Sequence, residues 1–286
     1  MAFLERASTE QERRLSFSML GWALNEEENV AEYIYRAEAF LRSMSDDFEL
    51  ILIDDASTDR TRDLIVEHQK TRPWLRLVVN EHNRGAGYNA KRAISLATKE
   101  YLFWQPVDWS YDISKLPESL PLLRQYDILQ GFREKPTSLG DLLKRRSDTP
   151  YKGFVSIANY LMVRVLFNLP LHDCQNVTLY PRALIQSVRL ECESAFINPE
   201  CLLKTWWKGA SFKEFPAPFL RRERGKSRGT KPLQIVIAVR DILLYWFRWI
   251  VMNGRQDRKR GTVSYWDETA IEQASAFKLA SRTSAE

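Results

Sequence analysis

The sequence predicts an α/β fold in which a mainly parallel sheet is flanked by helices. Three observations lead to this prediction. Strand-like and helix-like segments alternate through the first part of the chain, residues 48–53 form an almost continuous apolar run, and polar residues follow several of the strand-like segments. Alternating strands and helices build parallel sheets, and the strands of such sheets are buried on both faces.

The first two strand–helix units begin near Leu15. Residues 15–20 alternate in the manner of a strand. The helical pattern that follows has one apolar face, made by Val30, Ile34, Ala37 and Leu41. Residues 48–53 are the second expected strand. The next helix is expected to begin after Ser57 or Thr58, because either residue suits a helix N-cap.

A third unit lies between the expected strands at 75–79 and 101–104. The segment at 83–97 contains glycines that start a helix. The inward face of this helix is expected to be Ala90, Ala93, Ile94 and Ala97. The second half of the chain is less periodic. It is expected to contain strands at 127–133 and 177–182 and a helix at 151–169.

Polar residues stand where the expected strands end. They are Asn25, Glu26 and Glu27 after the first strand, Asp54 and Asp55 after the second, and Asp108 after the fourth. Ligands of parallel α/β sheets bind beyond the carboxyl ends of the strands. These residues are therefore the first candidates for a functional site.

The composition is that of a globular protein, with 44% hydrophobic and 28% charged residues. The net charge of +5 favours anionic partners, without choosing between phosphates, nucleic acid and lipid head groups. The three cysteines lack metal-ligand spacing, so we expect a reducing, cytoplasmic environment. The acidic first residues contain no apolar stretch of signal-peptide length, and the chain has no run of about 18 uncharged apolar residues.

The segment at 233–252 is the most apolar part of the chain and is expected to be an amphipathic helix. Its charges are Arg240, Asp241 and Arg248, and at about 100° per residue they share one sector of the helix surface. Basic residues stand on both sides of it in the sequence. This pattern indicates contact with an anionic membrane surface. A helix docked on its own subunit, or one that forms a homo-oligomer, is the alternative.

Four segments of the first half resemble, in order and spacing, family 2 glycosyltransferases with the GT-A fold. They read ALNEEENV, LILIDDASTDRTRDLI, NRGAGYNAKRAISLA and VDWSYDISKLPESLPLL. Four segments of the second half resemble the dolichyl-phosphate mannosyltransferase branch of that family. They read ILQGFR, DCQNVTLYPR, INPECLLK and KEFPAPFLRRERGKSRG. The last contains an R-x-x-G-x-S-[KR] element, made by Arg222, Gly225, Ser227 and Arg228.

The resemblance implies a GT-A-like glycosyltransferase domain at 14–230, followed at 231–286 by the amphipathic helix and a polar tail. It implies a hexosyltransferase that moves a sugar from a nucleoside diphosphate sugar with inversion at the anomeric carbon. The expected acceptor is a polyprenyl phosphate at the cytoplasmic face of the membrane, where the protein is peripherally associated. No nucleic acid partner is implied.

Two other functions are also compatible with the sequence. One is transfer to the hydroxyl of a glycan or lipid-linked oligosaccharide during polysaccharide synthesis. The other is a degenerate, non-catalytic protein that only binds nucleotide.

Asp108 matches the second Asp of the family's D-x-D motif, whereas Pro106 replaces the first. The resemblance therefore implies that Asp108 binds Mg²⁺ or Mn²⁺, with the other ligands supplied by water and the diphosphate. The alternative is that Asp108 is only a turn residue. Asp112 is either a substitute carboxylate or the cap of a helix that begins near Ser114.

The resemblance also assigns residues to the donor. Asp54 or Asp55 is implied to bind the base or ribose, with the backbone near Ala23 and with Asn25 and Glu27 beside it. Alternatively, Asp55 only caps the turn through Ser57 and Thr58. Arg84 and Gly85 belong to a glycine-containing loop before a helix, which suits the donor phosphates.

Four arginines match positions that handle phosphates in the polyprenyl-phosphate branch: Arg133, Arg182, Arg222 and Arg228. Guanidinium groups stay ionised and bind oxyanions in two-pronged fashion. Of these, Arg133, Arg182 and Arg222 are expected to be catalytic, and Arg228 to bind substrate. A phosphate acceptor is already an anion and needs no strong base. A hydroxyl acceptor would need one, with Asp173, Glu191 and Glu193 as the candidates.

Overall fold

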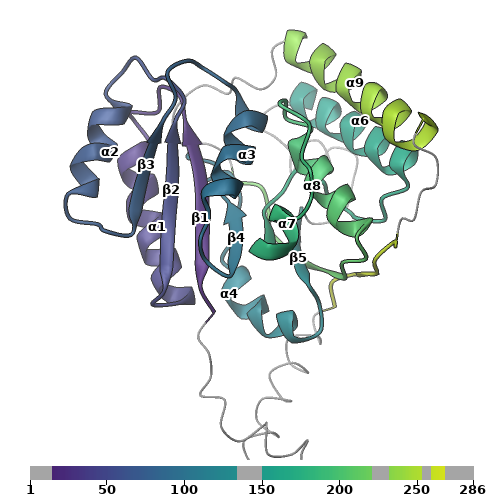
Figure 1. Cartoon of the computed structure of the whole chain (residues 1–286), viewed down its shortest axis with the longest axis horizontal. Coiled ribbons are helices and arrows are strands. Elements are labelled where there is room, and N and C mark those ends of the chain that lie inside the picture. Colours follow the sequence, from purple (N-terminus) through teal and green to yellow (C-terminus); the bar gives the residue numbers. More distant parts are fainter. Residues whose placement is uncertain (1–14, 134–149, 221–231, 253–258, 268–286) are drawn as a thin grey trace, which may run out of the picture.

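The computed structural model describes residues 15–133, 150–220, 232–252 and 259–267 of the chain. Within these residues its centre is an eight-stranded sheet with the order β3-β2-β1-β4-β6-β5-β7-β8 (Figure 1). The strands are β1 (Phe17–Ala23), β2 (Phe48–Asp54), β3 (Leu75–Val79), β4 (Tyr101–Trp104), β5 (Ile128–Phe132), β6 (Thr178–Pro181), β7 (Phe212–Pro216) and β8 (Val263–Ser264). Each neighbouring pair is parallel, except the two pairs that contain β6. The predicted α/β fold with a mainly parallel sheet is confirmed.

Helices cover both faces of the sheet. One face carries α1 (Val30–Met44), α2 (Thr61–Gln69), the short α4 (Leu116–Ser119) and the 3₁₀ turn η1 (Leu120–Arg124). The other face carries α3 (Ala86–Leu96), α6 (Pro150–Phe167), α7 (Arg182–Gln186), α8 (Ile197–Trp206), α9 (Pro232–Trp246) and the π-helical turn η2 (Phe247–Met252). In Figure 1, α6 and α9 lie side by side at one end of the molecule.

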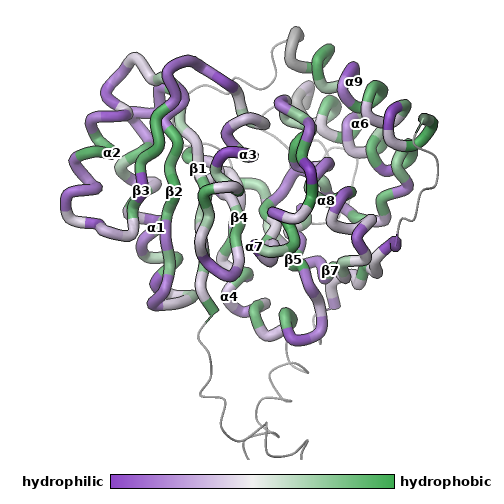
Figure 2. Tube along the Cα trace, in the orientation of Figure 1, coloured by the Kyte–Doolittle hydropathy of each residue, from purple (hydrophilic) through white to green (hydrophobic). Residues whose placement is uncertain are grey.

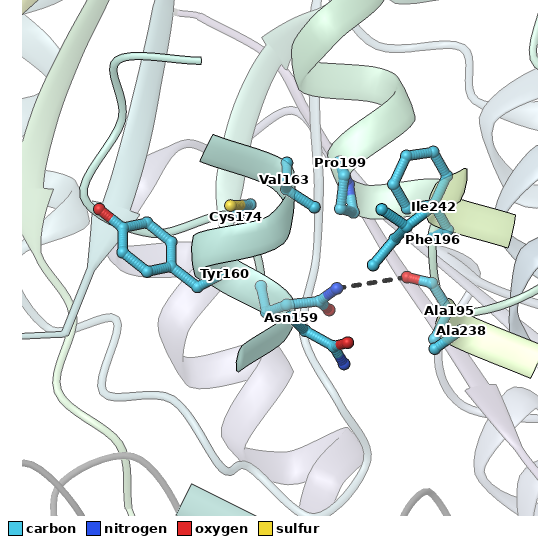
Figure 3. A pocket seen from close by; sticks show the side chains of 10 residues that line it. Asn159, Tyr160, Val163, Cys174, Ala195, Phe196, Pro199, Ala238 and Ile242 are labelled. Carbon is cyan, nitrogen blue, oxygen red and sulfur yellow. Dashed lines mark hydrogen bonds between the residues drawn. The ribbon is translucent and has the colours of Figure 1, made fainter. Parts of the chain in front are cut away.

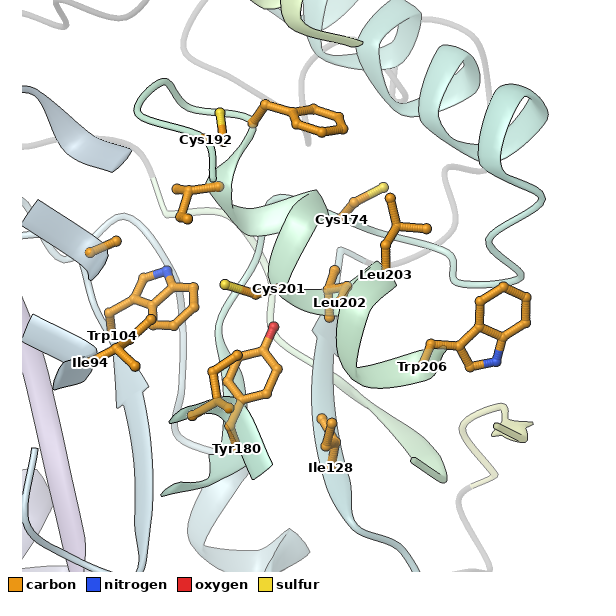
Figure 4. Packing of buried hydrophobic residues seen from close by; sticks show 14 of the residues in the cluster. Ile94, Trp104, Ile128, Cys174, Tyr180, Cys192, Cys201, Leu202, Leu203 and Trp206 are labelled. Carbon is orange, nitrogen blue, oxygen red and sulfur yellow. The ribbon is translucent and has the colours of Figure 1, made fainter. Parts of the chain in front are cut away.

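The two faces hold separate hydrophobic clusters. Met19 of β1 packs in the cluster that contains α1, and Leu20 packs in the cluster that contains α3. The four residues predicted on the inward face of α1 are all buried. The four predicted for the next helix are buried too: Ala90, Ala93 and Ile94 lie in α3, and Ala97 directly follows it. Figure 4 shows the second cluster, where Trp104 and Tyr180 stack with ring centroids 5.6 Å apart.

Glu49 is the one acidic residue inside the apolar run of β2, and polar partners accommodate it. Its carboxylate accepts hydrogen bonds from Ser18 Oγ at 2.7 Å and from Arg76 Nη1 at 2.8 Å. Burial favours the neutral acid, but these bonds and those from Thr98 outweigh it and hold the pKa of Glu49 below its ordinary value. The acidic residue therefore does not break the strand.

The N-cap prediction for α2 is wrong. The residue before α2 is Arg60, and it makes no side-chain capping bond. Ser57 and Thr58 instead bond to the loop after β1: Ser57 Oγ accepts from Asn25 N at 3.0 Å, and Thr58 N donates to Asn25 Oδ1 at 2.8 Å. Ser57 and Thr58 therefore connect the loops that follow β1 and β2, and neither is the N-cap of α2.

The segment at 233–252 forms α9 and η2, and it packs on the rest of the molecule. Ile242 and Trp249 are buried in the same cluster as α8, and β8 pairs with β7 at the sheet edge. The described part of the segment expected at 231–286 therefore shares the sheet and core of the preceding residues.

Much of the outward surface of α6 and α9 is apolar. The exposed side chains include Phe154, Leu161 and Val165 of α6, Val236, Leu243 and Leu244 of α9, and Phe247, Val251 and Met252 of η2. Figure 2 shows hydrophobic stretches along both helices. Among the described residues, no helix has both the length and the apolar character needed to span a bilayer.

Candidate active site

The carboxyl ends of β1 and β2 are joined by hydrogen bonds between their loops. Asp55 N donates to Ala23 O at 2.8 Å. Glu27 accepts from Arg60 N at 3.1 Å through its Oε2 atom. Asn25 has a φ of 51°, and its amide oxygen accepts the hydrogen bond from Thr58. The predicted donor-binding residues of the first strand therefore meet those of the second, as expected from parallel pairing.

Asp54 is fully buried and stabilises the turn that follows it. Its Oδ1 accepts from Ser57 N at 3.2 Å, and its Oδ2 pairs with Arg62 Nε at 2.9 Å. The capping alternative considered for Asp55 is therefore wrong, because the neighbouring carboxylate, one residue earlier, caps this turn.

Asp55 holds the loop between β3 and α3. Its Oδ1 accepts from Arg84 N at 2.8 Å and its Oδ2 from Gly85 N at 3.0 Å. Gly85 has a φ of +79°, a conformation that favours glycine, and it places both amides toward the carboxylate. The Arg84 guanidinium lies 4.3 Å from the centroid of the Tyr88 ring. Asp55 thus fixes the predicted phosphate loop at the carboxyl end of β2.

A polar network that the sequence analysis missed supports Asp55. Asn80 Nδ2 donates to Asp55 Oδ1 and to Asn89 Oδ1, both at 2.7 Å, and Arg92 donates to Asn80 Oδ1. Asn80 and Asn89 are both buried. Asn80 directly follows β3, so the rule that identified the ends of β1, β2 and β4 could have found it.

The turn after β4 carries Asp108. Trp109 N donates to Pro106 O at 2.9 Å, and Asp108 Oδ1 accepts from Ser110 N at 3.2 Å. Trp109 has a φ of 52°. Because β4 lies beside β1 in the sheet, Asp108 stands at the same edge as the donor-binding candidates.

Asp112 caps a turn rather than a helix. Its Oδ1 accepts from Ser114 N at 3.0 Å, but α4 begins two residues later, with Lys115 as its N-cap. A helix therefore begins near Ser114 as expected, and Asp112 caps the turn that leads into it.

Arg133 and Asp173 form a buried, two-pronged ion pair. Arg133 Nε lies 2.6 Å from Asp173 Oδ2, and Arg133 Nη2 lies 2.7 Å from Asp173 Oδ1. Burial disfavours the charged guanidinium, but the Asp173 carboxylate outweighs that effect and raises the pKa of Arg133. Asp173 Oδ1 also accepts from Gln175 N at 3.0 Å.

This pair lies at the same sheet edge as Asp108. β5 and β4 both pair antiparallel with β6, so they run in the same direction and their carboxyl ends share one edge. Arg133 follows β5, and Asp173 lies in the segment before β6. Tyr111, in the Asp108 turn, donates its hydroxyl hydrogen to Gln175 O and so joins the two parts of the edge.

Arg182 does not belong to this site. β6 runs against its neighbours, so Arg182, which follows it, lies at the opposite edge of the sheet. There its Nε donates to Lys99 O at 2.8 Å and its backbone N to Glu100 O at 2.9 Å. The prediction of a catalytic Arg182 is wrong for this topological reason. Arg222 and Arg228 lie outside the described residues.

Glu191 and Glu193 lie in a segment at 190–196 that crosses α3. Glu191 pairs with Lys204 Nζ and with Arg248 Nη1, both at 3.0 Å, and Glu193 pairs with Lys91 Nζ at 3.2 Å. Each of the two carboxylates is therefore paired with a cationic side chain. The segment packs so closely on α3 that a Cβ on Gly87 would lie 2.3 Å from the Glu193 carbonyl carbon.

Asp108 is the carboxylate at the expected metal position. No group of three His, Cys, Asp or Glu side chains suited to a metal occurs in the part of the chain that the structure describes. Mg²⁺ is usually held by one or two carboxylates together with substrate phosphates and waters. A single carboxylate therefore fits an ion that arrives with a diphosphate, although it does not form a complete protein site.

Comparison with known proteins identifies the family of this chain. Residues 22–189 match the model of glycosyl transferase family 2. Dodecaprenyl-phosphate galacturonate synthase of Rhizobium johnstonii is 28% identical over 197 residues, which are 65% of this chain and 53% of that protein. Undecaprenyl-phosphate 4-deoxy-4-formamido-L-arabinose transferase of Pectobacterium carotovorum is 27% identical over 60% of this chain and 51% of its own. The chain spans about half the length of these curated relatives.

Solved structures share the fold at low sequence identity. Glucosyl-3-phosphoglycerate synthase from Mycobacterium tuberculosis, in complex with Mg²⁺ and UDP, has a TM-score of 0.57 and 16% identity, and covers 86% of this chain and 82% of that one. S. aureus TarS with UDP-GlcNAc has a TM-score of 0.53 and 17% identity, and covers 94% and 73%. Because the family match spans more than half of its residues, the chain belongs to glycosyl transferase family 2.

Proposed function

We propose that the protein transfers a sugar from a nucleoside diphosphate sugar to a polyprenyl phosphate, with inversion at the anomeric carbon. The donor would lie over the loops that follow β1, β2 and β3. Asp55 shapes this pocket by holding the amides of Arg84 and Gly85, and Arg84 and the N-terminus of α3 stand near the diphosphate. Asp54 stabilises the adjoining turn.

Asp108 would hold Mg²⁺ or Mn²⁺ together with the donor diphosphate. When bound, such an ion neutralises the negative charge that develops on the departing diphosphate. The turn through Pro106 and Trp109 fixes the backbone on either side of Asp108. Its hydrogen bond from Ser110 N further orients the carboxylate.

The carboxylates that could serve as a general base are paired with cationic side chains, and this supports one class of acceptor. A hydroxyl acceptor must lose a proton, so an alcohol transferase needs a carboxylate free to take it. Both oxygens of Asp173 are hydrogen-bonded to Arg133, while Glu191 and Glu193 are paired with cations. A guanidinium-bound carboxylate is a weak base. This arrangement favours an acceptor that arrives ionised.

A phosphate acceptor fits the proposal without a base. One of its oxygens would attack the anomeric carbon as the bond from that carbon to the donor diphosphate breaks. The nucleoside diphosphate departs with the bonding electron pair, and no proton is transferred. Arg133, which Asp173 keeps ionised and oriented, stands at this edge to attract the acceptor phosphate. The polyprenyl-phosphate names of two relatives support this choice of acceptor.

The acceptor lipid implies work at a membrane surface, and we propose peripheral association with the cytoplasmic face. Asp241 of α9 is buried, and Arg248 of η2 pairs with Glu191. Apolar side chains on α6, α9 and η2 face outward instead. Exposed apolar side chains on neighbouring helices are suited to lipid contact.

The proposal is tested by incubating the full chain with labelled uridine and guanosine diphosphate sugars, Mg²⁺ and a C55 isoprenyl phosphate. We expect label from one donor to enter the organic phase with the lipid. A chain that binds nucleoside diphosphate but neither transfers the sugar nor hydrolyses the donor would instead be non-catalytic. Transfer only to a glycan hydroxyl would show that the acceptor is a glycan and not a lipid phosphate.

A further inference from the structure

Segment 170–173 leads to the ion pair of Asp173 with Arg133, and none of its residues belongs to a helix or strand. Hydrogen bonds from other elements hold it instead, at each of its four residues. We propose that Glu214 of β7, acting through His172, is a positioning residue of the acceptor site. It fixes Asp173 and thereby orients the Arg133 guanidinium. This inference rests on the proposed function, in which Arg133 attracts the acceptor phosphate.

Glu214 bonds to both the backbone and the side chain of His172. Its Oε1 accepts from His172 N at 2.7 Å, and its Oε2 lies 2.6 Å from His172 Nδ1. The Glu214 side chain is fully buried, whereas that of His172 is partly exposed. One carboxylate therefore fixes the residue immediately before Asp173 at two points.

A second buried side chain holds Asp173 from the neighbouring strand. Gln130 of β5 is the register partner of Glu214 in the parallel β5–β7 pair, and it is also fully buried. Its Nε2 donates to Asp173 O at 3.5 Å, and its Oε1 accepts from Thr178 Oγ1. Register partners on neighbouring strands present their side chains on the same face of a sheet. Adjacent polar side chains of β5 and β7 therefore bond to consecutive residues of segment 170–173.

Helix α6 holds the segment at Leu171. The Leu171 carbonyl accepts from the Tyr160 hydroxyl and from Arg164 Nη1, both at 3.2 Å. Figure 3 shows Tyr160 on α6, with its hydroxyl pointing away from Ala238 and Ile242 of α9. The polar end of Tyr160 is therefore directed to segment 170–173 and not to α9.

The segment after β8 contacts the same region. Tyr265 donates its hydroxyl hydrogen to Pro170 O at 3.1 Å, and its ring centroid lies 4.6 Å from that of His172. Lys213, the neighbour of Glu214 on β7, donates from Nζ to Tyr265 O at 2.7 Å. The His172 ring thus contacts both Glu214 and Tyr265.

The centre of β7 is an unfavourable place for a carboxylate. Burial raises the pKa of Glu214 above its ordinary value, and the two bonds from His172 oppose this effect without cancelling it. Replacing a buried ion pair by apolar residues is often neutral or stabilising. The geometry that Glu214 imposes on segment 170–173 therefore explains its presence better than stability does. Buried groups with shifted pKa values also gather at functional sites.

The two-pronged contact between Asp173 and Arg133 depends on where the Asp173 backbone lies. Both carboxylate oxygens must face the guanidinium, and Oδ2 also accepts from Arg133 N at 3.3 Å. If segment 170–173 moved, Arg133 would remain ionised but could turn away from the acceptor. The donor loops after β1, β2 and β3 do not include this segment. A defect at Glu214 should therefore weaken acceptor binding selectively.

Steady-state transfer by the full chain to a soluble C10 isoprenyl phosphate tests the proposal. Glu214→Ala should raise the KM for this acceptor at least about tenfold and leave the KM for the donor within about twofold of the parental value. Glu214→Gln should restore most of the acceptor affinity, because its amide oxygen can still accept from His172 N. An unchanged acceptor KM in Glu214→Ala, or an equal rise in both KM values, would overturn the positioning role.

Glu49→Ala is the matched control. It removes another buried strand carboxylate, at the amino end of β2 and so at the edge of the sheet opposite the site. It should lower the melting temperature without changing either KM. A selective rise in the acceptor KM of this variant as well would show that any loss of stability has this effect, and would contradict the proposal.

A measurement without substrate separates this proposal from the proposed function. The Arg133 Nε–H signal in nuclear magnetic resonance, assigned with Arg133→Lys, should exchange with water at least about tenfold faster in Glu214→Ala than in the parent or in Glu49→Ala. His172→Ala should act in the same direction and replaces Glu214→Ala if that variant does not fold. Parental exchange in the folded variant would overturn the positioning role. Faster exchange in a chain that transfers no sugar to a phosphate would overturn the proposed acceptor and retain the positioning of Arg133.

Discussion

Asp108 is the residue whose charge matters most to the proposed transfer. Its turn stands at the carboxyl end of β4, and Pro106 cannot coordinate a metal. We predict that transfer requires Mg²⁺ or Mn²⁺ and is lost in chelator. Asp108→Asn keeps the size of the side chain but removes its charge, and should lower turnover by more than about 100-fold, a barrier increase of about 2.7 kcal/mol.

Asp112→Asn is the matched control for this prediction. Its carboxylate accepts a hydrogen bond from Ser114 N, and an asparagine Oδ1 can accept the same bond. Steady-state turnover should therefore fall far less than in Asp108→Asn. Equal losses at the two positions would mean that they share a cation. Full activity in chelator would assign the neutralising role to arginine.

Asp55 is expected to matter through the loop that it holds. Asp55→Ala removes the acceptors of Arg84 N and Gly85 N, so the loop before α3 should lose its fixed conformation. We predict a folded variant whose melting temperature no longer rises with nucleoside diphosphate, because a ligand that binds only the native state raises its stability. Lys115→Ala, at an exposed position away from these loops, should keep the shift. A parental shift in Asp55→Ala would disprove this placement of the donor.

Among the elements, strands with a regular apolar pattern could be predicted from the sequence, whereas a strand with charged residues at its centre could not. β3 and β4 have the bounds expected from their apolar residues. β7 was not predicted, because Lys213 and Glu214 occupy its centre and interrupt the apolar pattern. Both are buried there, with Lys213 Nζ bonded to Tyr265 O and Glu214 to His172. Partners far away in the sequence make this strand possible, and a local pattern does not reveal them.

The candidate site, too, could be predicted only in part from the sequence. Asp55, Asn25 and Asp108 lie at one edge as expected, because residues after parallel strands gather there. Arg182 was misplaced, because the sequence does not show that β6 runs against its neighbours. The ion pair of Arg133 with Asp173 was also missed, since it joins residues 40 positions apart.

The close packing of segment 190–196 on α3 leads to an element-scale prediction. Alanine has a higher helix propensity than glycine, so Gly87→Ala would stabilise an isolated α3. In the protein, the new Cβ would clash with the Glu193 backbone, so α3 and segment 190–196 would have to move apart. We predict a loss of about 1–3 kcal/mol in the free energy of unfolding, together with weaker nucleotide binding, because Arg84 and Gly85 directly precede the displaced turn.

Denaturant unfolding of Gly87→Ala beside Ser95→Ala checks this prediction. Ser95 is an exposed residue of the same helix, and its substitution should change stability by no more than a few tenths of a kcal/mol. Parental stability in Gly87→Ala would show that segment 190–196 yields easily and does not hold the donor loop in place.

For the whole molecule, the outward apolar surface of α6, α9 and η2 predicts membrane binding. The protein should sediment with anionic vesicles, and less so as salt screens its basic residues. Leu244→Glu on α9, where the side chain is 52% exposed, should reduce the bound fraction severalfold. Val66→Glu, 44% exposed on α2, should not. Equal binding by both variants would remove this surface from the account.

In the proposed reaction, an ionised acceptor makes a general base unnecessary. The most direct test compares an isoprenyl phosphate with the alcohol of the same chain length, using one donor and the full chain. Because the two differ only in the phosphate, the account predicts transfer to the phosphate and at least about 100-fold slower transfer to the alcohol. Comparable rates with both acceptors would show that a carboxylate at this edge does act as a base, and would contradict the account.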